Sequence, residues 1–288
     1  MLIKRNLWLF FRDKANVFFS LLSVFIIIGL YVLFLGDIME GSLRSQLAVD
    51  SEWIAISIGG IMLGGMVAVT SVTSCSGAIS ISIKDKEYAA NDFLTSPINR
   101  NKIALSYLIS NTIIGIFMTG IALLLCVGYL VVIGGTLPTI SIWGKLLLTT
   151  ILSVLCANSM MYFISLFIKS RNAYSSFSSI SGTLIGFLMG IYIPIGQLPE
   201  SVGWVIRLFP MSHAASMFRQ LLASEGLAEL FSSAPEVALL EFQELVGVTF
   251  NFGGFMTSFW FSALVLMMST VIFSFLSIIV LKGKKLLL

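Results

Sequence analysis

The residues that could do chemistry are few, and most of them stand alone in the sequence. The one histidine, His213, lies near Ser212 and Ser216, and a serine activated by a histidine is the nucleophile of many hydrolases. No GxSxG sequence surrounds either serine, although it is typical of one large class of these enzymes. Closeness along the chain does not establish a catalytic geometry, so hydrolysis by Ser212 and His213 is the less favoured interpretation.

Metal and nucleotide chemistry find little support in the sequence. Cys75, Cys126 and Cys156 all fall inside apolar runs, without CxxC or Cys/His spacing, which predicts packing residues and no metal site. The chain also lacks the GxxxxGK[ST] sequence that cradles nucleotide phosphates. We therefore expect no cofactor on this chain and no ATP hydrolysis by that machinery.

The composition places the chain in a lipid bilayer. Of its 288 residues, 57% are apolar and 11% are charged, and the mean hydropathy is +1.00. Soluble domains have about 45–50% apolar and roughly 25% charged residues. The net charge of +3 is small, so we set nucleic-acid binding aside. Six apolar runs are long enough to span a membrane, over residues 17–36, 53–83, 103–133, 145–168, 174–195 and 252–281. We predict an all-α membrane protein with six transmembrane helices in a single domain, 1–288.

The charges between these runs predict the orientation. If the N-terminus is cytoplasmic, the inside segments hold 13 of the 17 Lys and Arg residues, and the positive-inside rule then places both termini in the cytoplasm. The runs themselves hold no ionisable residue away from their ends. Proton- and ion-coupled transporters usually need such a residue near the midplane, so the pattern favours energy delivered from outside the membrane domain.

No small-residue cleavage site follows the first apolar run, so we expect no cleavage after residues 1–16. These residues are predicted to form an interfacial helix. Four apolar side chains share one helical face, and the charged ones lie largely elsewhere. The apolar face comprises Ile3, Leu7, Phe10 and Phe11, and the charged residues are Lys4, Arg5, Arg12 and Asp13. Trp8 is expected at the level of the lipid headgroups.

A second irregular region precedes the last span. Three prolines in 194–222 divide two short apolar pieces, 200–209 and 211–222. A ten-residue helix is only about 15 Å long, so both pieces must return to the side that they left, as a re-entrant or interfacial hairpin. His213 is then expected at the outer membrane surface. With the glutamate-rich segment 223–251, the hairpin is expected to form an external subdomain, 196–251.

Two spans carry small and hydroxyl-bearing residues. Gly59, Gly60, Gly64 and Gly65 lie on one face of the second span, which is typical of close helix packing. The alternative, open for both spans, is that their inner halves line a partly hydrated pathway. The residues predicted to line that pathway are Thr70, Ser74, Ser175, Ser179 and Thr183.

The loop 84–102 begins with four consecutive charged residues, which at about 3 kcal/mol each must lie outside the hydrocarbon. Residues 87–94 are expected to form about two helical turns. This short helix exposes Tyr88, Phe93 and Leu94 among charged residues, before Pro97 ends it. The alternative to a docking surface is an ordinary solvated helix face.

Three stretches together resemble the membrane subunit of ABC-2 type transporters, a permease family that includes drug, antimicrobial-peptide and polysaccharide exporters. They are the basic start KRNLWLFFRDK, the loop EYAANDFLTSPINRNKIALSYLI and the hairpin LPESVGWVIRLFPMSHAASMFRQLL. The resemblance implies a half-transporter in the plasma membrane that pairs with a second half, identical or paralogous, and with two copies of a separate ATP-binding subunit that holds ATP and Mg²⁺.

The resemblance also implies which residues meet the ATPase, through the helix after the second span and the N-terminal helix. These coupling residues are Glu87, Tyr88, Asp92, Phe93, Leu94, Arg5 and Arg12. It implies, too, that the second and fifth spans line the pathway. We therefore expect an efflux permease for drugs, peptide antibiotics or lipid-like amphipathic molecules. A polysaccharide or teichoic-acid exporter and an intramembrane enzyme using Ser212 and His213 are the alternatives.

Overall fold

A computed structural model describes residues 2–31, 41, 52–88, 100–168 and 170–283, and nearly all of them are helical. The elements in chain order are α1 (Leu2–Arg12), α2 (Lys14–Leu30), α4 (Trp53–Tyr88), α6 (Arg100–Val132), α7 (Ile140–Ser165), α8 (Arg171–Leu188), the 3₁₀ turn η2 (Ile195–Gln197), α9 (Glu200–Leu208), α10 (Pro210–Leu222), α11 (Ser224–Leu230), α12 (Glu236–Leu245), β1 (Asn251–Phe252), β2 (Phe255–Met256) and α13 (Phe259–Gly283).

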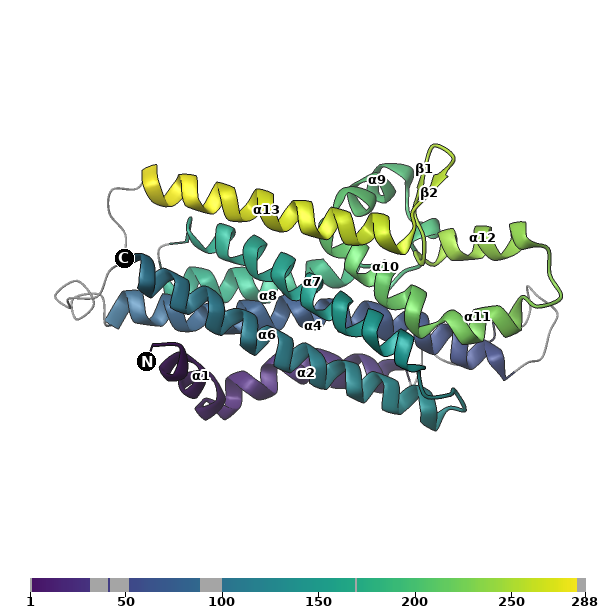
Figure 1. The fold of residues 1–288 in the computed structure, drawn as a ribbon, viewed down its shortest axis with the longest axis horizontal. Coiled ribbons are helices and arrows are strands. Elements are labelled where there is room, and N and C mark those ends of the chain that lie inside the picture. Colours follow the sequence, from purple (N-terminus) through teal and green to yellow (C-terminus); the bar gives the residue numbers. More distant parts are fainter. Residues whose placement is uncertain (1, 32–40, 42–51, 89–99, 169, 284–288) are drawn as a thin grey trace.

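The long helices run side by side along the longest axis of the molecule, with α1 at one end and α11 and α12 at the other (Figure 1). Helix α4 has 36 residues, about 54 Å at 1.5 Å per residue. It lies at the centre, because α2, α6, α7, α8, α10 and α11 all pack against it. This position explains why α4 is apolar or small on every side over most of its length.

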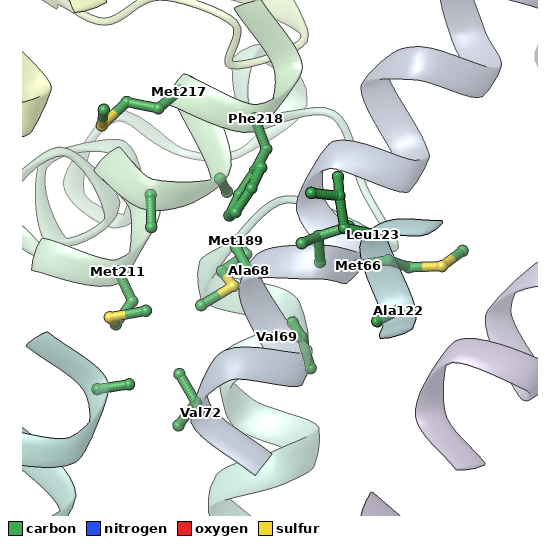
Figure 2. Close-up of a cluster of buried hydrophobic side chains, with 14 of the residues drawn as sticks. Met66, Ala68, Val69, Val72, Ala122, Leu123, Met189, Met211, Met217 and Phe218 are labelled. Carbon is green, nitrogen blue, oxygen red and sulfur yellow. The ribbon is translucent and has the colours of Figure 1, made fainter. Parts of the chain in front are cut away.

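The main hydrophobic core joins α4 to α10 and to the end of α8. Figure 2 shows Met211 and Phe218 of α10 with Met189 and with Val69 and Val72 of α4. All five side chains are at least 97% buried. The short helix α10 is therefore a central packing element, although the sequence predicted only that it belongs to a hairpin.

Four described helices are long and apolar enough to cross a membrane, over Trp53–Asp85, Lys102–Val132, Ile140–Ser165 and Phe259–Lys282. Two predicted spans are not among them. Helix α2 has 17 residues, and residues 32–36 of the predicted first span lie outside the described part of the chain. Helix α8 has 18 residues, of which five are serines and one is threonine. The total of six spans therefore stays a prediction.

Two predicted span boundaries are wrong, and glycine explains both. The fifth span was expected to reach residue 195, but α8 ends at Leu188 and Gly190 adopts a left-handed φ of 62°. The last span was expected to begin at residue 252, but α13 begins at Phe259. Before it, Gly253 and Gly254 have φ values of 64° and 99°. Two consecutive positive values suit a tight hairpin turn, and they join β1 to β2.

Prolines separate the two helices of the predicted hairpin. Pro199 lies at the N-cap position of α9, and Pro210 is the first residue of α10, where a proline's missing N–H breaks no helical hydrogen bond. The two short helices confirm the division into 200–209 and 211–222 to within a residue or two. Whether they enter the bilayer stays a prediction.

Segment 223–251 folds into α11, α12 and the loop that leads to β1. Its apolar side chains form a small core of their own with Ile61 of α4, including Leu227, Phe231 and Val248. The glutamates of α12 lie outside this core, and Glu236 and Glu241 are exposed. The segment is therefore attached to the end of α4 opposite α1 (Figure 1).

Candidate functional site

One end of the bundle holds a junction of α1, α4 and α6. The Arg5 guanidinium donates to both carboxylate oxygens of Asp85, at 2.8 and 2.9 Å. The Tyr107 hydroxyl donates to the same carboxylate at 2.5 Å. The hydrogen bonds with Asp85 raise the pKa of Arg5, and partial burial opposes them. Arg5 therefore ties the N-terminal helix to the last turns of α4, just before the segment predicted to contact an ATPase.

The apolar face of α1 packs against α6. Phe10 is fully buried in a small core with Ile114 and Met118, and the Asn6 amide donates to the Ser110 hydroxyl at 3.1 Å. Phe11 contacts Phe117 edge to face at 5.3 Å. The predicted amphipathic helix exists, and its orientation is fixed by protein contacts.

The opposite face of α1 is exposed. Trp8 has 65% of its surface accessible, and the Arg12 guanidinium lies 5.9 Å from the centre of its ring. Lys4 is exposed on the same side, one turn earlier. Of the two arginines predicted to couple α1 to an ATPase, Arg12 is thus on the accessible face and Arg5 is engaged with Asp85.

The predicted docking segment is only partly described. Helix α4 continues through the charged residues to Tyr88, so Glu87 and Tyr88 belong to its last turn and not to a separate helix. Asp92, Phe93 and Leu94 lie outside the described residues. Their role in coupling stays a prediction.

The hydroxyls predicted to line a pathway in α4 are buried in the bundle. Thr70 donates to the Met66 carbonyl at 2.9 Å, and the neighbouring Ser71 accepts a hydrogen bond from Ser153 of α7 at 2.7 Å. The Ser74 hydroxyl is buried, with no hydrogen-bond partner among the described residues. In a single chain, α4 therefore presents these groups to neighbouring helices.

The hydroxyls predicted to line a pathway in α8 are exposed. Ser179 donates to the Ser175 carbonyl at 3.0 Å, and Thr183 donates to the Ser179 carbonyl at 3.5 Å. The helix meets α4 through a different face, where Ser76 contacts Tyr174 at 3.1 Å and Ser178 at 2.8 Å. The predicted lining residues of the two helices thus do not share one surface of this chain.

At the other end of the bundle, Arg219 is fully buried on α10. Its guanidinium donates to four backbone carbonyls: Ile61 at 3.1 Å, Gly247 at 3.2 Å, Met189 at 2.5 Å and Gly190 at 3.1 Å. Among the described residues no carboxylate pairs with it. Arg219 therefore holds α4, the end of α8 and the end of α12 together.

Arg219 was not predicted from the sequence as a site residue. Two signals could have identified it. Arg219 is the only charged residue in 211–222, and the glycines of the second span needed a close neighbour. A Cβ on Gly64 would lie 2.7 Å from the Arg219 nitrogen, and one on Gly65 would lie 3.0 Å from its guanidinium. The packing interpretation of these glycines is confirmed.

His213 does not pair with the serines next to it in sequence. Its Nε2 lies 2.9 Å from the Arg207 carbonyl oxygen, and its Nδ1 lies 3.2 Å from the Ser262 hydroxyl of α13. Ser212 donates to the Leu188 carbonyl, and Ser216 donates to the Val248 carbonyl. His213 is also 99% buried, so its contacts join α10 to α13, and its expected level at the outer membrane surface stays a prediction.

A family model described as ABC-2 type transporter matches residues 1–223. That range runs from α1 to the end of α10 and includes the Arg5 junction and Arg219. No curated protein matches the chain.

Proposed function

The chain belongs to the ABC-2 type transporter family, and from this premise we propose that it is the permease half of an ATP-driven exporter. Membership of the family makes it a membrane-embedded transport subunit and not itself an enzyme. The hydrogen bonds near His213 also argue against a serine hydrolase, because Ser212 and Ser216 donate to backbone carbonyls and not to the His213 ring. Family membership alone does not give the direction of transport, the substrate class or the partners, so these are further proposals.

We propose amphipathic drugs, antimicrobial peptides or lipid-like molecules as substrates, and hence a role in efflux and antibiotic resistance. The support is the surface that α8 offers, where the exposed Ser175, Ser179 and Thr183 alternate with the exposed Ile180 and Leu184. Between Ser175 and Leu184 this surface carries hydroxyls and apolar groups and no charge, which suits a molecule of mixed polarity. A polysaccharide or teichoic-acid exporter of the same family is the second candidate, because hydroxyl groups also bind sugars.

The proposed assembly has two permease halves, identical or paralogous, and two copies of a separate ATP-binding subunit that holds ATP and Mg²⁺. The observation that carries the coupling is the Arg5–Asp85–Tyr107 junction. It joins α1 and α6 to the end of α4, where segment 89–99 follows. A movement of that segment on ATP binding would therefore be transmitted to α1, α4 and α6 together.

Co-purification with the ATP-binding subunit tests this assembly. Phe93→Ala should weaken the association by about 2 kcal/mol, because aromatic anchors usually dominate such interfaces. Asp92→Asn should have a smaller effect, because charges at an interface rim mainly steer and orient. The docking role is wrong if Phe93→Ala and Leu94→Ala both retain normal binding and substrate-stimulated ATP hydrolysis.

We also propose a plasma-membrane location with both termini in the cytoplasm, from the distribution of Lys and Arg. Single cysteines in a cysteine-free background test this orientation. A cysteine at Ser233, between α11 and α12, should react with an impermeant reagent in intact cells, and one at Asn91 should not. The reverse labelling pattern contradicts the orientation.

A further inference from the structure

A cavity of about 340 Å³ opens at the end of the bundle opposite α1. Its walls come from the start of α4, the end of α6, the loop before α7 and the junction of α10 with α11. Ile56, Leu130, Ile142 and Leu222 make most of this lining apolar. The volume and character are those of sites for small organic molecules, which are mostly apolar with a few placed polar groups.

One charged residue, Glu225, lies among the residues that line this cavity. Its Oε2 accepts hydrogen bonds from the Thr136 backbone N–H at 3.2 Å and from the Thr136 hydroxyl at 2.9 Å. These two bonds fix the carboxylate on the cavity wall. Among the described residues that line the cavity there is no Lys or Arg, so Glu225 carries the only charge on the described wall.

The geometry points to a binding site for amphipathic organic cations, with the ammonium group at Glu225 and the apolar chain between α4, α6 and α10. A single carboxylate offers too few ligands for a metal ion, and its charge opposes an anion. An apolar wall next to one fixed negative charge selects a molecule that carries both an apolar part and a positive charge.

This inference sharpens the proposed function, because it narrows the amphipathic substrates to cationic ones and rests on that proposal for its biological meaning. If both termini are cytoplasmic, as proposed, the site is on the external face. Binding is measured on the permease alone, without ATP or an ATP-binding subunit. A negative result would therefore overturn the site and leave the proposal of export intact.

The experiment compares two probes of equal chain length, decylammonium and decanol, on the full-length permease in phosphatidylglycerol nanodiscs. Glu225→Gln should weaken decylammonium binding about threefold to fivefold, as expected for a partly exposed ion pair. It should leave decanol binding unchanged. Glutamine still accepts the bonds from Thr136, so the variant removes the charge and keeps the local structure.

Glu229→Gln is the matched control, because Glu229 is an exposed residue of the same helix and does not line the cavity. Equal decylammonium binding by the wild type, Glu225→Gln and Glu229→Gln overturns the site. An equal loss for decylammonium and decanol on Glu225→Gln overturns the role of the charge.

A second pair of variants tests the apolar wall. Ile142→Trp should fill the cavity and weaken both probes, whereas Ile140→Trp should weaken neither, because Ile140 is 89% exposed and outside the lining. Normal binding by Ile142→Trp overturns the placement of the chain in this cavity.

Two sources of the same chemistry remain, a free amphiphile or the ammonium headgroup of phosphatidylethanolamine. Adding phosphatidylethanolamine to the nanodiscs distinguishes them. Competition that depends on Glu225 identifies the lipid as an occupant, and binding that is indifferent to the lipid identifies a free amphiphile. Competition equally strong in Glu225→Gln means that the lipid acts elsewhere and overturns the lipid as an occupant of this site.

Discussion

Two arginines at opposite ends of the bundle differ in their hydrogen-bond partners and in their exposure to solvent. Arg219 is fully buried and donates to four backbone carbonyls, with no carboxylate partner among the described residues. Arg5 is partly exposed and forms a two-bond ion pair with the carboxylate of Asp85. Arg219 links α10 to α4 and to the ends of α8 and α12, and Arg5 links α1 to α4. The environment of each guanidinium decides what its bonds can do.

Three of the four carbonyls around Arg219 belong to the backbone at two helix ends, and the fourth, that of Ile61, lies within α4. Met189 and Gly190 follow the last turn of α8, and Gly247 follows α12. Carbonyls at a helix C-terminus carry partial negative charge and otherwise lack donors. Removing the arginine would leave several of them unpaired away from water, so we regard this contact as a permanent connection.

The Arg5 pair has access to water, so its charges can be solvated when it separates. Exposed ion pairs contribute about 0–1 kcal/mol. A contact of that strength can break and reform during each transport cycle. The difference between the two arginines therefore separates a fixed end, around α10, from an adjustable end, around α1.

The largest expected effect is on the fixed end. Arg219→Met should destabilise the protein by at least about 3 kcal/mol, because each buried carbonyl left without a donor costs about 1–3 kcal/mol. Thermal unfolding of the purified protein in detergent measures this loss. Arg219→Lys should recover part of the stability, since an ammonium has three donors and a shorter reach.

Arg207→Met is the control for that change. Arg207 is only partly buried, and its bond to Glu244 is 3.3 Å long, so its removal should cost about 1 kcal/mol or less. Equal unfolding temperatures for Arg219→Met and the wild type would show that the carbonyls find water or other donors. The idea of a fixed end would then be wrong.

The next effect tests how closely α10 approaches α4. A Cβ on Gly60 would lie 2.5 Å from the Leu222 carbonyl oxygen, and backbone atoms cannot move aside as a flexible side chain does. Gly60→Ala should therefore cost about 1–3 kcal/mol, the usual range for overpacking. Gly120→Ala is the matched control, because nothing lies within 4 Å of its added methyl group. The control should be neutral or stabilising in the same unfolding experiment.

The sequence predicted the division of the hairpin and the packing role of these glycines for local reasons. Pro210 can begin a helix but cannot continue one, and paired small residues allow helices to approach. The partners of Arg219 could not be predicted in this way. They are backbone groups as far as 158 positions away in sequence, and backbone carbonyls leave no signature in the residue types.

The wrong predictions of helix ends have a related cause, because residue types do not reveal the backbone conformation either. Hydropathy reports where the hydrocarbon ends, whereas α4 continues to Tyr88 through Lys84 and Asp85, since charged residues such as lysine are good helix formers. In α8, Gly190 ends the helix because it adopts a positive φ. A glycine inside a span and one at a helix end look the same in a sequence. The candidate site was predicted in part, because Arg5 was identified but its partner Asp85 was not.

The third prediction concerns the adjustable end. Asp85→Asn should lower the unfolding free energy by about 1 kcal/mol or less, since the pair is partly exposed. It should nevertheless lower substrate-stimulated ATP hydrolysis severalfold, because α1 and α4 would no longer move together. Lys4→Gln is the control, because Lys4 lies on the exposed face of α1. It should leave substrate-stimulated ATP hydrolysis unchanged. A loss of stability in Asp85→Asn comparable to that of Arg219→Met would contradict the distinction between the two ends.

The last and smallest effect on stability uses two adjacent serines of α8. Ser178 contacts Ser76 of α4 at 2.8 Å, whereas Ser179 is exposed and bonds only within its own helix. Ser178→Leu should be destabilising, because it places a larger side chain in a helix contact and removes a hydrogen bond. Ser179→Leu should change the unfolding free energy by about 0.5 kcal/mol or less, as is usual for surface positions.

If the exposed face of α8 lines the transport route, Ser179→Leu should still alter the transport rate or the substrate preference. Unchanged transport by Ser179→Leu, in a correctly assembled complex, would mean that this hydroxyl face serves packing and that the route lies elsewhere.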